Sequence, residues 1–436
     1  MESGHLTSAR TARIIGKSPM CVARRVLSGL LLCIFLFHLA CTSLPLHSCA
    51  GADDDGNPQF PGLLCCDASG LRFYFTGDTF LKRAEELIRG ARDYILISVF
   101  VILDDEKGRY VLDLLKKRME ENIRVYVVAD SCSGFVSGFV EGRTALPYLV
   151  KNEIPATEFN PIRANRFARL PVFEYRDHQK FWLIDGETVV LGGQNIWSPS
   201  LDSPEDSGTT DSMVEFRSAT AAKQLVTNFV KEWNAYSMEK LKEEDFAVRT
   251  SCGDGDCLWL VQQDRFTNPL IGEMFDRLLD MAQREIWMIQ AYTMPDRSVL
   301  QKIRRLTAKG ISVNILFSST FHKLDKFYYA TGYRMRDLIE AGAVLWEYGH
   351  PKSHLHYKGI IVDERWFTIG SANFNYRSCH LSKELNILFE GSELGTPMLE
   401  NLEELKAGCR RVSQELASQR RGLRFLIYYL FLFFGG

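Results

Sequence analysis

The sequence has little net charge. Its 52 lysine and arginine residues nearly balance 54 aspartate and glutamate residues, so the 436-residue chain carries a formal charge of −2. A chain with this balance has no general positive field to attract nucleic acid, and an anionic ligand must be bound by local groups. With 46% hydrophobic and 24% charged residues, the composition is that of a folded protein rather than a disordered one.

Metal-binding patterns are also missing. The eleven cysteines include no Cys-x-x-Cys pair, and no cysteine and histidine cluster has the spacing of a zinc site. We therefore expect no metal ion and no other cofactor. Cys252 and Cys257 flank a GDGD segment and could form a disulfide in an oxidising compartment, while two unpaired thiols are an equal alternative.

No apolar run reaches the ~20 residues that a membrane-spanning helix needs. The run VLSGLLLCIFLFHLA, residues 26–40, follows a basic stretch with a single glutamate. A basic stretch before a short apolar run is typical of an export signal, and Ser48-Cys49-Ala50 offers a cleavage site. We expect residues 1–50 to direct export or membrane association, either as a cleaved or lipidated signal or as a retained anchor.

The C-terminal residues 420–436 place arginines before ten apolar residues, Phe425–Phe434. This run is again too short to cross a bilayer as a helix. A basic flank with aromatic residues suits peripheral contact with a membrane surface. An equal alternative is a last strand or helix that packs into the core.

Two parts of the chain repeat one order of elements. Residues 86–105 and 277–296 each begin as a helix and continue into a short strand, ILISVFV or IWMIQAY. A second helix and strand follow in both copies, and then a less regular stretch, 131–170 or 318–352. Apolar residues at helical spacing define the first helices: Phe80, Ala84, Leu87 and Ala91 in one, and Ile271, Phe275, Leu278 and Ala282 in the other.

Alternating helices and buried strands predict an α/β fold. We expect two lobes from an internal duplication, residues 67–249 and 257–415, each a mixed, largely parallel sheet flanked by helices. The Gly- and Asp-rich segment 250–257 is the expected joint. The first lobe should close with a helix whose apolar face carries Leu225, Phe229, Trp233 and Tyr236.

One set of polar residues occurs twice at equal spacing. The first copy, DHQKFWLIDGETVVLGGQN, contains His178, Lys180, Asp185 and Asn195. The second copy, HYKGIIVDERWFTIGSAN, contains His356, Lys358, Asp363, Ser371 and Asn373. Residues two apart on a strand face the same side, so each histidine projects with its lysine into one space. One such motif is weak evidence, but two at equal spacing are strong evidence of a functional site.

Both motifs are predicted to continue into hairpins that turn after Ile184 and Val362. The aromatic residues in these hairpins, Phe181, Trp182, Trp366 and Phe367, are expected in the core rather than in a lipid-binding slot.

With these residues the chain resembles the phospholipase D superfamily, which is named for a paired His-Lys-Asp motif. The resemblance covers residues 70–415 and is closest in pattern to bacterial cardiolipin synthases, because it includes Gly-Gly-x-Asn, Gly-Ser-Ala-Asn-x-x-Tyr-Arg-Ser and AYTMPD at 291–296. It implies that both motifs meet at the lobe interface in one active site. Neither lobe would be complete alone, which explains why the motif occurs twice.

The residue types suit an anionic phosphodiester. Lys180 and Lys358 supply positive charge, and Asn195, Asn373 and the Ser371 hydroxyl supply neutral donors to the phosphate oxygens. Donors that are fixed before reaction stabilise the charge that develops in the transition state.

The resemblance also implies a covalent phosphohistidine. We expect His178 to be the nucleophile and His356 the proton donor, since neutral and protonated imidazoles are both accessible near neutrality. It gives Asp211 and Glu384 the role of fixing one imidazole tautomer. Asp185 and Asp363 are expected to hold the hairpins rather than touch the substrate.

Three nearby residues have simpler expectations. His354 is expected at the surface or rim, and His322 lacks the spacing of the motif and should not be catalytic. Gly193 stands where many members of the superfamily have serine, so the first lobe lacks one hydroxyl. We expect activity to survive this change.

The expected function is therefore that of a phospholipase D-type phosphodiesterase or phosphatidyltransferase. Water as acceptor would give phosphatidate, and an alcohol such as phosphatidylglycerol would give cardiolipin. We expect a phospholipid substrate, contact with a membrane surface and a monomeric catalytic unit. A nuclease is the first alternative because residues 161–176 contain four arginines. A non-catalytic membrane-associated protein is the second, although both histidines and both lysines are present.

Overall fold

The computed structural model describes residue 60 and residues 63–133, 143–162, 175–249, 256–264, 270–318 and 325–433. Residues 1–50, His322 and Cys252 lie outside these ranges, so the export signal and the disulfide remain predictions. Residues Gln59–Gly436 form one compact unit. Within the described ranges, no helix combines the length and the apolar character that crossing a membrane requires.

The first lobe contains seven strands and five helices in the described residues. Its strands are β1 (Leu64–Thr76), β2 (Tyr94–Val99), β3 (Arg124–Asp130), β4 (Ala156–Phe159), β5 (Phe181–Ile184), β6 (Thr188–Gly192) and β7 (Thr210–Arg217). Its helices are α2 (Gly77–Gly90), α3 (Glu106–Glu120), α5 (Leu146–Lys151), α7 (Ser198–Leu201) and α8 (Ala219–Tyr236), with 3-10 turns η2 (Pro204–Asp206) and η3 (Glu243–Asp245).

The second lobe repeats this order and adds a C-terminal extension. Its strands are β8 (Asp256–Gln263), β9 (Glu285–Gln290), β10 (Ser312–Ser318), β11 (Val344–Tyr348), β12 (Gly359–Val362), β13 (Trp366–Gly370), β14 (Glu384–Glu390) and β15 (Cys409–Arg411). Its helices are α9 (Leu270–Met281), α10 (Arg297–Ala308), α11 (Asp325–Glu340), α12 (Tyr376–His380), α13 (Ser392–Ala407), α14 (Gln414–Gln419) and α15 (Leu423–Phe433).

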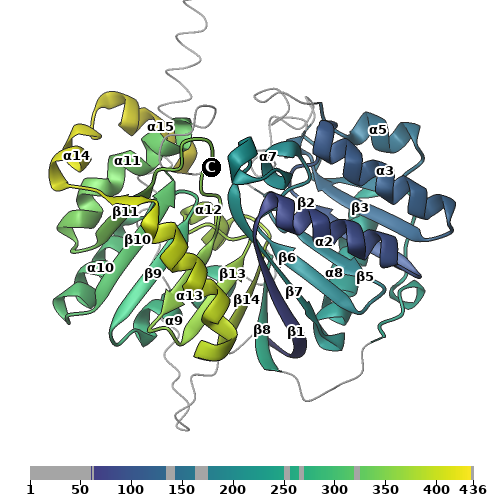
Figure 1. The fold of residues 1–436 in the computed structure, drawn as a ribbon, viewed down its shortest axis with the longest axis horizontal. Coiled ribbons are helices and arrows are strands. Elements are labelled where there is room, and N and C mark those ends of the chain that lie inside the picture. The colour runs from purple at the N-terminus through teal and green to yellow at the C-terminus, as the bar shows by residue number, and fades with distance from the viewer. Residues whose placement is uncertain are drawn as a thin grey trace, which may run out of the picture. The chain divides into compact units, whose positions relative to one another are not determined.

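The strands of the described residues form one sheet, in the order β15-β11-β10-β9-β12-β13-β14-β8-β1-β7-β6-β5-β2-β3-β4. Figure 1 shows β1 and β8 side by side where the two lobes join. From this junction outward, both lobes have the same strand order and the same strand directions. The two-lobed, mixed α/β fold is thus confirmed.

Parallel pairing is confined to β2-β3-β4 and to β9-β10-β11, and the other neighbours are antiparallel. The parallel part is therefore smaller than expected. Each motif hairpin, β5–β6 or β12–β13, adds antiparallel strands beside the first parallel strand of its lobe. The less regular stretches also hold structure that the sequence analysis missed, namely α5 and β4 in the first lobe and α11 and β11 in the second.

The predicted apolar faces are buried in three clusters. One cluster joins α2 and α3 to the first-lobe sheet, a second joins α9 and α10 to the second-lobe sheet, and a central one contains residues of α8, α13, β1 and β8. The four hairpin aromatics are at most 3% exposed, as expected: Phe181, Trp182, Trp366 and Phe367.

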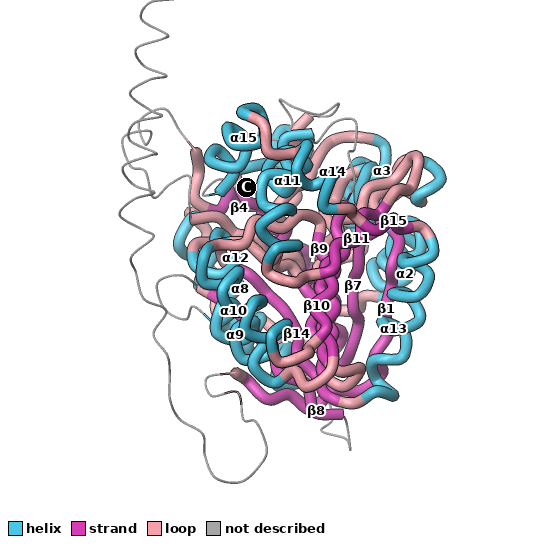
Figure 2. Tube along the Cα trace, turned by 90° about the vertical axis from the view of Figure 1, so that its left-hand side faces the viewer, coloured by secondary structure: helices cyan, strands magenta, loops and turns pink. Residues whose placement is uncertain are grey.

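The C-terminal residues up to Phe433 form α14 and α15, and α15 packs along α11 (Figure 2). Arg420, expected in a basic flank, is buried and pairs with Glu347 at 2.8 Å. Tyr429 is also buried, whereas Leu423 and Ile427 are exposed. The tail thus combines features of both alternatives, since one side is packed and the other is open.

Candidate active site

The two motifs meet where the lobes join. Two isolated parallel bridges join the lobes, Asp177 with Lys383 and Leu355 with Thr210. In each bridge, the residue before a motif histidine pairs with the residue before a carboxylate of the other lobe. The His178 backbone N–H donates to the Lys383 carbonyl at 3.0 Å. The His356 N–H donates to the Thr210 carbonyl at 2.7 Å. This backbone register brings each histidine beside a carboxylate of the other lobe.

The two histidine–carboxylate pairs are therefore crossed between the lobes. The His178 Nδ1 lies 3.0 Å from both carboxylate oxygens of Glu384. The His356 Nδ1 lies 2.5 Å from Asp211 Oδ2. Both carboxylates are fully buried, while the histidine side chains are 14% and 22% exposed. An Nδ1–H that donates to a carboxylate leaves Nε2 available for chemistry on the open side of each ring.

The surroundings of the two carboxylates differ. Glu384 also accepts from the Ser371 hydroxyl and from the Ser378 hydroxyl, both at 2.6 Å. Asp211 accepts instead from the Ser212 backbone N–H at 2.8 Å. Gly193 occupies the place that Ser371 has in the second lobe, and a Cβ there would lie 2.1 Å from Asp211 Oδ1. A serine at 193 would therefore displace the carboxylate from its present position.

The lysines lie beneath the histidines. The Lys180 ammonium donates to the His178 carbonyl at 2.6 Å, and that of Lys358 donates to the His356 carbonyl. Burial lowers the pKa of Lys180 to about 7, and Glu384 opposes this shift while Lys358 adds to it. Burial likewise lowers the pKa of Lys358 to about 8. A bound phosphate would relieve the repulsion between the two lysines.

Both imidazoles favour the neutral form in the substrate-free protein. Burial lowers the pKa of His178 to about 4, Glu384 opposes the shift, and the lysines of both lobes add to it. Burial also lowers the pKa of His356, again with Lys358 and Lys180 contributing. Since each ring senses the lysine of the other lobe, the four side chains share one electrostatic site.

The two motif asparagines have different partners. Asn195 accepts from the Val101 N–H at 3.0 Å and thereby fixes the loop after β2. The Asn373 amide donates to the Tyr292 hydroxyl at 3.2 Å. Asn375 donates to the same hydroxyl at 3.4 Å. Tyr292 belongs to the AYTMPD segment, which the sequence analysis noted without giving it a role.

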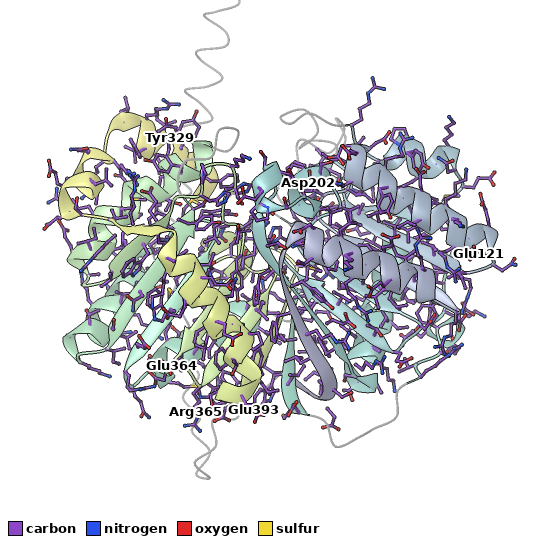
Figure 3. The ribbon with its side chains drawn as sticks, in the orientation of Figure 1. Glu121, Asp202, Tyr329, Glu364, Arg365 and Glu393 are labelled. Atoms are coloured by element: carbon purple, nitrogen blue, oxygen red, sulfur yellow. The ribbon has the colours of Figure 1, made fainter. Side chains whose placement is uncertain are left out.

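The motif aspartates lie at the far ends of β5 and β12. Asp185 accepts from the backbone N–H groups of Arg92, Asp93 and Tyr94. Asp363 accepts in the same way from residues 283–285. Both aspartates have positive φ at the hairpin turn. Figure 3 labels Glu364 in the second turn, at the opposite end of the sheet from Tyr329 of α11.

A buried polar network supports His178 from behind. Asp177 accepts from Ser98 and from Gln179, and the Lys383 ammonium pairs with Glu232 of α8. Lys383 was not predicted to be a site residue, although its place directly before Glu384 was a signal. Ser378, the serine of the Tyr-Arg-Ser segment after Asn373, was not predicted to have a role either.

His354 is buried, contrary to the expectation that it lies at the surface or rim. It is 7% exposed rather than at the surface, and its ring lies 6.1 Å from that of His356 in an edge-to-face arrangement. Burial lowers the pKa of His354 to about 3. The residue is buried because its segment inserts beside Thr210 of the other lobe, a contact that the local sequence does not reveal.

In the parts of the chain that the structure describes, no three histidine, cysteine, aspartate or glutamate side chains gather as a potential metal site. The groups that could neutralise a bound anion here are Lys180 and Lys358.

Comparison with known proteins gives matches that span both lobes. The family model described as the phospholipase D-like domain of cardiolipin synthase matches residues 85–233 and 275–406. Cardiolipin synthase 2 of Bacillus anthracis is 25% identical over 323 residues, which are 71% of this chain and 59% of the relative. The chain thus spans less than two thirds of that relative's length. Cardiolipin synthase A of Pseudomonas fluorescens is 26% identical over 386 residues, 87% of this chain and 77% of the relative.

A solved structure has the same fold. The phosphatidylserine synthase of Haemophilus influenzae superposes with a TM-score of 0.64 at 16% identity. The match covers 84% of this chain and 97% of that protein.

Proposed function

Because the chain belongs to the family of phospholipase D-like domains of cardiolipin synthases, we propose that it is a phosphatidyltransferase that acts on phospholipids. The observation that carries the proposal is the pair of crossed histidine–carboxylate contacts above two buried lysines. The substrate would be a phospholipid such as phosphatidylglycerol. All four site side chains come from one chain, so a monomer would be a complete catalytic unit.

In the first step, the lone pair on Nε2 of His178 attacks phosphorus and forms a P–N bond. The bond between phosphorus and the head-group oxygen breaks, and His356 donates its Nε2 proton to that oxygen. With phosphatidylglycerol the released alcohol is glycerol. Lys180 and Lys358 neutralise the phosphate oxygens while charge develops on them.

In the second step, the now neutral His356 removes a proton from the acceptor hydroxyl. The acceptor oxygen attacks phosphorus, and the P–N bond breaks with its electron pair returning to His178. A second phosphatidylglycerol as acceptor gives cardiolipin, and water gives phosphatidate. The same residues serve both acceptors, so the choice depends on whether water or an alcohol reaches the phosphohistidine.

The different surroundings of the carboxylates support the division of roles. Two serine hydroxyls share the charge of Glu384, which leaves less of it to stabilise a protonated His178. His178 is therefore suited to remain neutral and attack. Asp211 has no serine hydroxyl among the described partners, and its 2.5 Å contact suits an imidazolium at His356. A substrate phosphate adds negative charge, which raises the pKa of His356 so that the ring can carry the proton that it donates.

Nuclease activity is the less favoured alternative. Of the four arginines in residues 161–176, Arg176 lies within the described residues, and it is fully buried and paired with Asp130 at 3.2 Å. It therefore offers no surface charge to a nucleic acid. Export through residues 1–50 and action at a membrane surface remain parts of the proposal.

The test is to incubate the purified full-length protein with radiolabelled phosphatidylglycerol or phosphatidylcholine, with and without added glycerol. We expect cardiolipin or phosphatidate from the wild type, unchanged by EDTA because the lysines supply the charge. Duplex DNA serves as the alternative substrate. Salt-sensitive DNA cleavage without any lipid product would overturn the proposal in favour of a nuclease.

A further inference from the structure

Helix α15 has one face packed against the protein. Tyr429 is buried, and its ring lies 5.1 Å from that of Tyr333 in α11. Phe425 and Tyr428 contact the ring of Tyr329 with centroid distances of 5.0 and 5.5 Å. These contacts fix which side of α15 faces the molecule.

The other face of α15 is apolar and open. Leu423 is 72% exposed and Ile427 is 49% exposed. They share one side of the helix with the partly buried Leu426, at the spacing i, i+3 and i+4. Leu430, one turn further on, packs against the cluster that contains Met294, Ala330 and Tyr429. The other exposed large apolar residues of the described chain occur singly on other segments: Tyr110, Val150 and Met238. A helix that is apolar on both sides needs an apolar partner on each.

Two arginines lie at the N-terminal end of α15, next to Leu423 in the chain. Arg424 is exposed, with its guanidinium 4.0 Å from the ring of Tyr329 in α11. The Arg421 side chain is 39% exposed and lies 3.2 Å from Asp337 of α11. Exposed apolar side chains with arginines at one end of the helix match a membrane surface with anionic head groups. Two copies of the chain that paired these faces about a twofold axis would bring their arginines together, which disfavours that partner.

The helix also adjoins the candidate active site. One aromatic cluster contains Tyr429 of α15 and Tyr292, whose hydroxyl accepts from Asn373. Phe327 of α11 stacks on Tyr292 at 4.6 Å. Figures 1 and 2 both show α15 at the same end of the molecule as α12, the helix that follows Asn373.

We propose that Leu423, Leu426 and Ile427 dock into the surface of an anionic bilayer and hold the candidate active site close to it. This inference rests on the proposed function, because it explains how a head group within a membrane reaches the two histidines. The buried face keeps α15 on α11, while the open face enters the boundary between head groups and acyl chains.

Hydrogen exchange of the full-length protein tests the docking itself. Vesicles that contain phosphatidylglycerol should slow the exchange of backbone amides in residues 423–433, and vesicles of phosphatidylcholine alone should do so much less. This local readout separates α15 from any membrane contact made by residues 1–50. Equal exchange rates with and without vesicles would overturn the proposal.

Other occupants of the face predict different results. Protection without vesicles that grows with protein concentration would mean that a second copy covers α15. That result would overturn docking to a bilayer.

A double variant, Leu423→Glu with Ile427→Glu, tests the functional consequence. Both side chains are exposed, so the fold should tolerate the change. We expect kcat/KM on phosphatidylglycerol vesicles to fall at least tenfold, and kcat/KM on a monomeric short-chain phosphatidylglycerol to stay unchanged. Val150→Glu with Met238→Glu is the matched control, because these exposed apolar residues lie on other segments; it should change neither activity.

Equal losses on both substrates, or full activity on vesicles, would contradict the role of α15. If the wild type turned over neither substrate, the proposed function would fail. Lipid-dependent protection of residues 423–433 would still support the docking in that case.

Discussion

The two half-sites at the lobe junction share one motif but differ in their second layer. The half-site of His178 has a glutamate that two serine hydroxyls also contact. The half-site of His356 has an aspartate beside a glycine, with a backbone N–H as its other described partner. The two copies thus share the histidine and lysine of the motif, while the residues around the carboxylates differ.

This difference would allow two near-identical imidazoles to take the two roles proposed for them. A carboxylate that shares its charge with hydroxyls stabilises a protonated histidine less than one that does not. The pair of His178 and Glu384 therefore suits a nucleophile, and the pair of His356 and Asp211 suits a proton donor. Because the pairs are crossed, the histidine of each lobe is oriented by a carboxylate of the other lobe. Neither lobe can therefore orient its own histidine.

Replacement of the two histidines should have the largest effect. His178→Asn should lower kcat by about 10⁴-fold or more on every substrate, because the covalent route is lost. His356→Asn should cost about 10²- to 10⁴-fold on phosphatidylglycerol. The first step should recover most of its rate on a phosphatidyl ester of p-nitrophenol, whose leaving group needs no proton, while turnover stays slow because His356 also activates the acceptor. The burst of p-nitrophenol in a rapid-mixing experiment measures this recovery, and a burst from His178→Asn instead would reverse the roles.

Replacement of the carboxylates should come next. Asp211→Asn should lower kcat by about 10³-fold, because an amide cannot stabilise an imidazolium and favours the wrong tautomer. Glu384→Gln should cost about 10- to 100-fold, since it changes the orientation of a neutral ring. Circular dichroism checks the fold of both variants. A larger loss for Glu384→Gln than for Asp211→Asn would contradict the proposed asymmetry.

Exchange of the small residues should have a moderate effect. Gly193→Ser introduces a Cβ where Asp211 Oδ1 lies 2.1 Å away, so we expect a loss of about 1–3 kcal/mol in unfolding free energy. Activity should fall about tenfold as the carboxylate moves away from His356. Ser371→Gly, the mirror change, should reduce activity less, because it removes a neighbour of Glu384 without displacing it. Thermal unfolding and kcat are measured for both variants. If Gly193→Ser had the stability and kcat of the wild type, the short distance between residue 193 and Asp211 would not limit the side chain at this position.

Removal of one serine hydroxyl should have the smallest effect, and it should appear in the pH profile. Ser378→Ala leaves more of the Glu384 charge for His178, which raises the pKa of His178 above about 4. A protonated imidazole cannot attack, so kcat/KM falls as pH falls through this pKa. The acid limb of the Ser378→Ala profile should therefore lie at higher pH than that of the wild type. Ser382→Ala is the control, and a shift to lower pH would contradict the argument.

The sequence predicted the parts of the site that repeat. The spacing of His178 and Lys180 recurs at His356 and Lys358, and strand periodicity puts each pair on one side. The apolar pattern also predicted the first helices and both hairpins. These signals are local, so neighbouring residues are sufficient to read them.

The crossed pairing could not be predicted, because it depends on how the lobes dock. Bridges between residues 177 and 383 and between residues 355 and 210 set it, and no local pattern specifies them. The burial of His354 has the same cause, whereas Arg176 is buried against Asp130, Ser131 and Asn160 of its own lobe. Helix α11 was missed because its apolar face is largely aromatic and packs partly on α15, so the usual aliphatic period is absent.

The most direct test of a single shared site with divided roles is to locate the covalent intermediate. The His356→Asn protein would be mixed with the phosphatidyl ester of p-nitrophenol labelled at phosphorus, because this ester forms the P–N bond without a proton donor. The sample would be quenched in alkali, in which a P–N bond survives, and digested. We predict label on the peptide that contains His178, and no labelled peptide from the His178→Asn protein. Label on His356 in the His178→Asn protein, or turnover by the wild type without any labelled histidine, would contradict the account.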